Sequence, residues 1–263
     1  MTILIRAVFF LLLSANAFSM EYRWGQIDET KGRTSSSAKE VIYLTGDIRF
    51  GDYDRFRTFL LRDFESYLMS IRSVYISSNG GDVVEAIKIG QLLREMYAEV
   101  YIPPDSTCAS ACFVLYVSAI ERSSSGKVGI HRPYFDQRYF AGLGPMNAEK
   151  RHLELTKAFN DYLERNYVSR QLVDRMNGTS SKEIRWLTEE DLDELGKYAN
   201  WYEEFLLAKC KLAPNFWEDI DLLLKNDKEY TEFNDCKEKV IQPELRVRLK
   251  QFLSRPIQSQ KSR

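Results

Sequence analysis

The sequence predicts an α/β fold with a parallel sheet, followed by a helical C-terminal extension. Between residues 41 and 131, segments rich in β-branched and aromatic residues alternate with segments whose apolar residues recur at helical spacing. This alternation is typical of a parallel sheet with helices packed on it. Beyond Ala199 the pattern is helical and rich in charged residues, which predicts helices outside the sheet.

The first part of the pattern predicts strand, helix, strand and helix in turn. Val41–Ile48 is rich in β-branched residues and predicts a strand, and apolar residues then recur at helical spacing from Phe56 to Leu68. Val74–Ser77 predicts a second strand. Asp82, with Glu85 three residues later, resembles a capping box and opens a helix that we expect to reach Met96.

The next part continues the alternation. Val100–Ile102 predicts a third strand, which Pro103-Pro104 ends. Ala109–Ile120 is apolar nearly all round and predicts a buried helix. Lys127–His131 predicts a fourth strand, and Asn147–Asn166 predicts a helix with one apolar stripe.

The last part of the chain is predicted to be helical. Thr188 and Asp191 have the spacing of a capping pair, and the short helix that they open ends at Gly196. Trp201–Leu212 and Trp217–Lys225 predict two helices of the extension. We therefore expect five segments: a signal peptide (1–19), a polar linker (20–40), the α/β domain (41–199), the helical extension (200–257) and a disordered tail (258–263).

The N-terminus has the order of a secretory signal peptide. A cation at Arg6 precedes the apolar run Ala7–Leu13, and Ala15-Asn16-Ala17 is a small-residue cleavage pattern. The run is shorter than the roughly 20 residues that span a bilayer. We expect export and cleavage, with no transmembrane span in the mature chain; a retained anchor is the alternative.

Composition narrows the range of functions. The chain has 37 Lys+Arg against 38 Asp+Glu, so no charge excess points to nucleic acid or an anionic membrane. No Cys-x-x-Cys or His-x-x-x-His pattern suggests a metal site. We therefore expect neither a metal nor another cofactor.

The four cysteines fall into two pairs, and an exported chain retains disulfides. Cys210 and Cys236 would staple the helices of the extension. Cys108 and Cys112 allow three interpretations: a disulfide, which requires Cα atoms within about 7 Å; two buried apolar thiols; or a nucleophile among them.

Ser110 is the first candidate for chemistry, because it lies at the start of the predicted buried helix. A serine nucleophile needs a base beside it and amide donors for the oxyanion, and the amide of Ala111 is one candidate donor. The Gly80-Gly81 turn lets backbone approach a ligand closely. The structural alternatives are an N-cap serine and an ordinary strand–helix turn.

His131 is the candidate base, since it ends a predicted strand where α/β sheets place functional side chains. The alternative is a half-buried histidine without a role. His152, at the start of the Asn147–Asn166 helix, is expected to serve packing or to lie at the surface.

Four segments in order resemble the Clp protease and crotonase superfamily. Ser-Asn-Gly-Gly at 78–81 resembles its Ser-Pro-Gly-Gly turn, and Cys-Ala-Ser-Ala-Cys at 108–112 resembles its Ala-Ser-Met-Gly segment. Ile-His-Arg-Pro at 130–133 is similar to Ile-His-Gln-Pro, and Trp-Leu-Thr at 186–188 with Gly196 is similar to Phe-Leu-Ser…Tyr-Gly. The resemblance covers about Val41–Lys197. The Cys-x-Ser-x-Cys form resembles most a bacterial periplasmic branch.

The resemblance implies repeated β-β-α units and a serine peptidase site. Ser110 would be the nucleophile, His131 the general base, and the amides of Gly81 and Ala111 the oxyanion hole. It also implies a peptide or protein substrate, assembly with further copies of the chain, and the periplasm of a Gram-negative-type bacterium or secretion.

The sequence departs from this pattern at the acidic triad member. Ile184 stands at the position of the acid; Glu183 is its neighbour, and Asp174 is another candidate. Asn79 replaces the proline of the turn, and Cys112 replaces a glycine. The site is then a Ser–His dyad, a triad with another carboxylate, or inactive.

Three other functions stay open. The first is an inactive Clp-like module that binds peptides, which Ile184 favours. The second is a Ser–Lys dyad of the signal peptide peptidase A type, with Lys150 or Lys157 as base. The third is a crotonase-type acyl-CoA enzyme, although CoA thioesters are not expected outside the cytoplasm.

Overall fold

The computed structural model describes residues 19–27, 39–67, 72–213, 216 and 227–254. Most of the predicted signal peptide, the predicted helix Trp217–Lys225 and the predicted tail 258–263 lie outside these residues. In the described part, no helix is long and apolar enough to cross a membrane.

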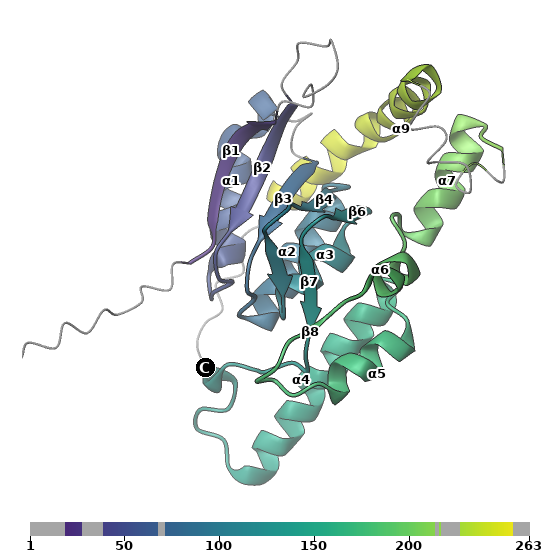
Figure 1. Ribbon diagram of the computed structural model, residues 1–263. Coiled ribbons are helices and arrows are strands. Elements are labelled where there is room, and N and C mark those ends of the chain that lie inside the picture. The colour runs from purple at the N-terminus through teal and green to yellow at the C-terminus, as the bar shows by residue number, and fades with distance from the viewer. Residues whose placement is uncertain (1–18, 28–38, 68–71, 214–215, 217–226, 255–263) are drawn as a thin grey trace, which may run out of the picture.

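The larger sheet has five strands and is parallel except at one edge (Figure 1). Its order is β1 (Glu21–Ile27), β2 (Lys39–Thr45), β3 (Ser73–Ser77), β4 (Glu99–Ile102) and β6 (Glu121–Ser124). Strands β2, β3, β4 and β6 pair in parallel, and β1 pairs antiparallel with β2. This confirms the predicted α/β class with a parallel sheet.

Alternation along the strands decides which face of this sheet is covered. In β2 the side chains of Ile42 and Leu44 are fully buried, whereas Tyr43 between them is half-buried. The buried face packs against α1 (Asp52–Tyr67), α2 (Val83–Glu95) and α3 (Cys112–Ser118), which Figure 1 shows on one side of the strands. Apolar residues at every second position fit this one-sided cover.

The smaller sheet has three strands, β5 (Thr107–Ala109), β7 (Lys127–Ile130) and β8 (Arg185–Trp186), in that order. Strand β5 pairs in parallel with β7, and β8 pairs antiparallel with β7. Two units, β4-β5-α3 and β6-β7-α4, each send one strand to either sheet before a helix. The predicted β-β-α repeat is thus present twice.

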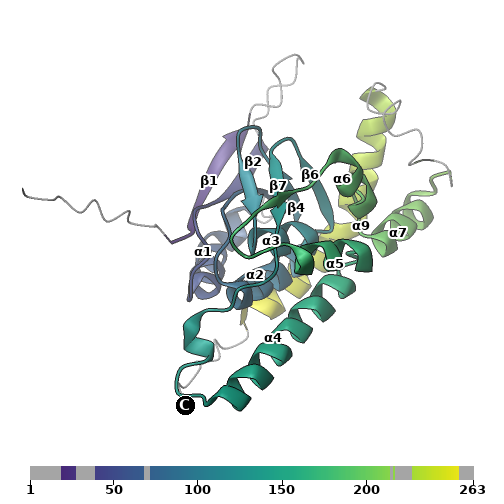
Figure 2. The same cartoon turned by 60° about the horizontal axis from the view of Figure 1, so that its bottom comes forward.

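The remaining helices lie around the sheets (Figure 2). They are the 3₁₀ turn η1 (Gln137–Tyr139), α4 (Pro145–Arg165), α5 (Arg170–Gly178), α6 (Glu189–Leu195), α7 (Asn200–Cys210) and α9 (Asp227–Ser254). Helix α9 packs against α2 and α7, and a disulfide joins Cys210 to Cys236 with Cα atoms 5.9 Å apart. The helical extension and its disulfide are therefore confirmed.

Two local predictions were wrong, and several elements were not predicted. Residues 21–27, predicted as part of a linker, form β1, because they pair along their whole length with β2. The helix predicted from Ala109 begins only at Cys112, since Thr107–Ala109 pair with β7. Helix α5 and the polar strand β6 were not predicted at all. In each case pairing or packing with a distant segment overrides the local pattern.

Candidate active site

Ser110 lies between the end of β5 and the start of α3, in a backbone conformation that is rare for serine. Its φ is +58°, in the left-handed region. Its amide donates to the carbonyl of Gly129 (2.9 Å), and its carbonyl accepts from the amide of Phe113 (3.0 Å). Ser110 therefore precedes the helix rather than occupying its first turn. Such conformations persist where the surrounding structure enforces them, often at functional sites.

A disulfide closes a short loop around Ser110. Cys108 in β5 and Cys112 at the start of α3 are bonded, with Cα atoms 5.1 Å apart. Both side chains are fully buried. The disulfide interpretation is thus confirmed, and neither cysteine is a free thiol that could act as the nucleophile.

The Gly80-Gly81 turn packs directly against Ser110. Gly80 has φ +98° and Gly81 has φ +139°, which side chains rarely adopt. A Cβ atom on Gly80 would lie 2.6 Å from the Cβ of Ser110 and 2.8 Å from the amide nitrogen of Ala111. Two backbone hydrogen bonds with Ile48 hold the turn. The amide of Ile48 donates to the carbonyl of Gly80 (2.7 Å), and the amide of Asp82 donates to the carbonyl of Ile48 (2.8 Å).

Two amides beside Ser110 have no acceptor among the described residues. Throughout the described residues, neither the amide of Gly81 nor that of Ala111 donates a hydrogen bond to the protein. Close packing of Gly80 on Ala111 brings the two segments that carry these amides together. Two such donors are what an oxyanion requires.

His131 follows β7 immediately, and β7 is the strand that pairs with β5. Ala109 in β5 pairs with Gly129 in β7. Ser110 therefore follows its paired residue by one position, and His131 follows Gly129 by two. The Nδ1 atom of His131 lies 2.7 Å from the carbonyl oxygen of Arg132. A carbonyl only accepts, so in the neutral imidazole Nδ1 carries the hydrogen and Nε2 is the nitrogen with the lone pair. No hydrogen bond among the described residues joins Ser110 to His131.

The candidate acids are not brought to His131. In the described part of the chain, the carbonyl of Arg132 is the only hydrogen-bond partner of the His131 ring. The register Ile130–Arg185, continued by one residue, sets His131 opposite Ile184, whose side chain packs over Gly129. Glu183 and Asp174 are exposed. The backbone carbonyl thus occupies the bonding position that an acid would take.

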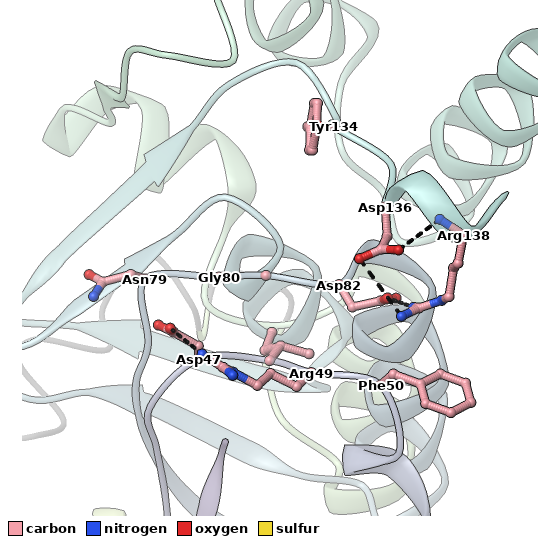
Figure 3. Close-up of a pocket in the computed structure, with 11 residues that line it drawn as sticks. Asp47, Arg49, Phe50, Asn79, Gly80, Asp82, Tyr134, Asp136 and Arg138 are labelled. Carbon is pink, nitrogen blue, oxygen red and sulfur yellow. Dashed lines mark hydrogen bonds and ion pairs between the residues drawn. The ribbon is translucent and has the colours of Figure 1, made fainter. Parts of the chain in front are cut away.

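A pocket of about 650 Å³ extends from the Gly80-Gly81 turn (Figure 3). Arg138 in η1 forms an ion pair with Asp82 and stacks over the ring of Phe50, 4.7 Å from its centroid. In Figure 3 the ion pair and Tyr134 lie at different edges of the pocket. Neither Ser110 nor His131 lines this pocket, so it would hold a part of a ligand away from the reacting bond.

Two features of the site have no sequence signal that we could find. Nothing local marks Arg138 as the partner of Asp82, because 56 positions separate them in the chain. The hydrogen bond from the His131 ring to the carbonyl of Arg132 depends on the backbone conformation of these two residues. In the described residues, no group of three or more His, Cys, Asp or Glu side chains could hold a metal ion.

The chain matches no family model, and no curated protein matches it. Among solved structures, it is similar to a ClpP1 mutant from Listeria monocytogenes, with 18% sequence identity and a TM-score of 0.44. The match covers 60% of this chain and 88% of that chain.

Proposed function

We propose that this protein is an exported serine hydrolase that cuts peptide bonds through an acyl-enzyme on Ser110. The observation that supports this proposal most strongly is the environment of Ser110. The serine is held at φ +58° against a glycine turn, and the amides of Gly81 and Ala111 have no acceptor in the part of the chain that the structure describes. A purely structural serine at a helix start has no need of either feature.

In the proposed reaction His131 acts as general base without a carboxylate behind it. Nε2 of His131 takes the proton of Ser110 as Oγ bonds to the substrate carbonyl carbon. The amides of Gly81 and Ala111 donate to the resulting oxyanion. The C–N bond then breaks, His131 returns the proton to the leaving amine, and water cleaves the acyl-enzyme by the same route.

Export is proposed from the N-terminal segment and the cysteines. The charged, apolar and small-residue order of residues 1–17 supports a signal peptide. Both cysteine pairs are bonded, and disulfides persist in oxidising compartments such as the periplasm. Assembly with further copies of the chain stays a proposal from the resemblance alone.

The Ser–Lys alternative has little support from the two lysines. The ammonium of Lys157 pairs with Asp161 (2.7 Å) at the surface of α4, and Lys150 is exposed on the same helix. A lysine base must be neutral, which burial or a cationic neighbour favours. Neither of these side chains is buried.

One observation favours a second candidate, a peptide-binding module without activity. Ile184 lies at the register position opposite His131, and no carboxylate bonds to the imidazole in the described structure. Turnover separates the two candidates, because only the hydrolase needs Ser110 to react.

Labelling with a fluorophosphonate probe tests the proposed function. We expect one adduct, on the peptide that contains Ser110, and none in Ser110→Ala. His131→Gln should slow labelling by about 10³-fold or more, because the serine loses its base. The matched control is Lys239→Gln, which changes an exposed side chain of α9 and should leave the rate unchanged.

Two results would overturn the proposal. One is an adduct that persists in Ser110→Ala. The other is the absence of any adduct or peptide turnover in a folded, oxidised protein that still binds peptides, which supports the binding module instead.

A further inference from the structure

One guanidinium connects the two sides of the pocket beside the Gly80-Gly81 turn. Arg138 lies on one side, on the loop that follows His131. Its ion pair with Asp82 and its contact with the ring of Phe50 reach the other side (Figure 3). In the part of the chain that the structure describes, Arg138 is the only cation that pairs with Asp82.

The backbone beside this ion pair carries the candidate oxyanion amide of Gly81. The carbonyl of Gly80 accepts from the amide of Ile48 (2.7 Å), and a peptide group is planar and trans. The Gly81 N–H belongs to the same peptide group, so it points away from Ile48. The amide of Asp82 donates to the carbonyl of Ile48 (2.8 Å), which fixes the next peptide group. The direction of the Gly81 amide therefore depends on how the segment around Ile48 lies against the turn.

Arg138 contacts both segments of this backbone pairing. Its guanidinium pairs with Asp82, which follows Gly81 directly. The same guanidinium lies over the ring of Phe50, two positions after Ile48, at 4.7 Å from the ring centroid. Glycine gives the turn wide backbone freedom, so contacts from outside the turn must restrict it. A planar guanidinium that contacts both segments supplies such a restraint.

The loop that carries Arg138 is fixed at both of its ends. Asp136 accepts from the amide of Arg138 (2.9 Å), which holds the start of η1. At the other end, the amide of Arg132 donates to the carbonyl of Thr179 (3.1 Å), just after α5. The segment that follows His131 is therefore attached to α5 at one end and to the oxyanion turn at the other.

We propose that Arg138 is a positioning residue, which holds the turn that carries the Gly81 amide against the loop after His131. Arg138 touches no reacting atom and acts through Asp82 on the oxyanion donor. The expected effect on rate rests on the proposed function, whereas the restraint on the turn can be measured without any reaction.

Labelling kinetics test the effect on the reaction. The probe is an N-acetyl-alanyl diphenyl phosphonate, and a series of concentrations separates its binding constant KI from its maximal labelling rate kinact. Arg138→Gln should lower kinact about tenfold and leave KI within about twofold, because misplacing a group that acts in the transition state costs rate rather than binding.

Variants of the partner show whether the ion pair is responsible. Asp82→Asn keeps a good N-cap side chain for α2 but loses the charge, so it should lower kinact by the same factor. The double variant should be no slower than either single variant, because both remove one interaction. Arg138→Lys keeps the cation and should recover part of the rate.

The matched control is Arg175→Gln, which removes an ion pair of similar burial elsewhere. Arg175 pairs with Asp191 in the first turn of α6 (2.6 Å), and their side chains are 33% and 7% exposed, against 35% and 6% for Arg138 and Asp82. Each glutamine variant leaves a nearly buried carboxylate without this cation, so both should unfold at lower urea concentration. Only Arg138→Gln should lower kinact.

Relaxation of ¹⁵N-glycine-labelled protein measures the restraint itself. The order parameters of the Gly80 and Gly81 amides should be near the rigid value of about 0.85, fall in Arg138→Gln and stay unchanged in Arg175→Gln. Unchanged order parameters in Arg138→Gln, or an unchanged kinact, would refute the inference. If the order parameters fall as expected but Ser110 of the unaltered protein is never labelled, the proposed function fails and the positioning of the turn stands.

Discussion

At the scale of single residues, the candidate site depends on two backbone conformations that most side chains avoid. Ser110 has φ +58° and Gly80 has φ +98°, and the two residues touch. The position of the Ser110 hydroxyl therefore depends on the absence of a side chain at residue 80. The close approach to Ser110 requires glycine at residue 80, in addition to the requirement that the turn itself imposes.

Gly80→Ala is expected to slow fluorophosphonate labelling of Ser110 by about 10²-fold. The new Cβ would lie 2.6 Å from both the carbonyl oxygen of Ala109 and the Cβ of Ser110, so the serine must shift. A displacement near 1 Å costs about this factor when reacting atoms must be aligned. Gly142→Ala is the matched control, because Gly142 also has positive φ (+78°) but nothing within 4 Å of the added atom. Equal effects of the two changes would mean that strain rather than the clash is responsible.

At the scale of elements, a disulfide joins β5 to α3 on either side of Ser110. The other disulfide joins α7 to α9, far along the chain. The first closes a loop of 4 residues and the second a loop of 26. Loop-closure entropy then predicts stabilisation of about 2 kcal/mol for the short loop and about 3.5 kcal/mol for the long one.

Removing the first disulfide should therefore affect the site more, and removing the second should affect stability more. Cys108→Ala with Cys112→Ala should lower the labelling rate of Ser110 at least tenfold, because the loop that fixes its conformation is opened. Cys210→Ala with Cys236→Ala should lower the free energy of unfolding more, yet leave labelling of the folded protein unchanged. Urea denaturation and labelling rates measure the two effects. Unchanged labelling in the first variant would show that the disulfide does not position Ser110.

The elements that the sequence predicted correctly are those with strong local patterns. The capping pair Thr188–Asp191 forms both of its hydrogen bonds, and Asp82 caps α2 by accepting from the amide of Glu85. Strand β6 was missed because it contains Arg122, which is buried. Its guanidinium donates to the carbonyls of Val117, Leu195 and Gly196, which satisfies a charge that no local pattern can account for.

In the candidate site, too, local patterns could be predicted from the sequence, whereas contacts between distant segments could not. The segments that hold Gly81, Ser110, Ala111 and His131 were found from their order in the sequence. Their conformation was not, because the pairing of β5 with β7 moves Ser110 out of the helix. The bonding partner of His131 could not be predicted either, since a backbone carbonyl carries no sequence signal.

At the scale of the whole molecule, buried charges attach the C-terminal extension to the sheet. Lys237 of α9 is buried between Glu99 of β4 (3.0 Å) and Glu121 of β6 (2.8 Å). Burial alone lowers the pKa of Lys237, but the two carboxylates outweigh burial and raise it. The raised pKa means that this ion pair stabilises the fold below the unfolded lysine pKa of 10.5 and ceases to do so as pH rises through the folded value.

Lys237→Met should lower the free energy of unfolding by about 3 kcal/mol at pH 7, where the contribution is fully present. The change leaves two carboxylates partly buried beside each other without this cation. Urea denaturation measures the effect, and Lys239→Met, at an exposed position of the same helix, is the matched control. A loss no larger than that of the control would mean that the Lys237 ion pairs do not stabilise the attachment of α9.

The central claim is that Ser110 is a nucleophile beside an oxyanion hole made by Gly81 and Ala111. A crystal structure of the fluorophosphonate-treated protein tests it most directly. We predict phosphorus bonded to Oγ of Ser110, with one phosphoryl oxygen about 2.7–3.1 Å from both amide nitrogens. An adduct on another residue, or a phosphoryl oxygen that contacts neither amide, would contradict the account.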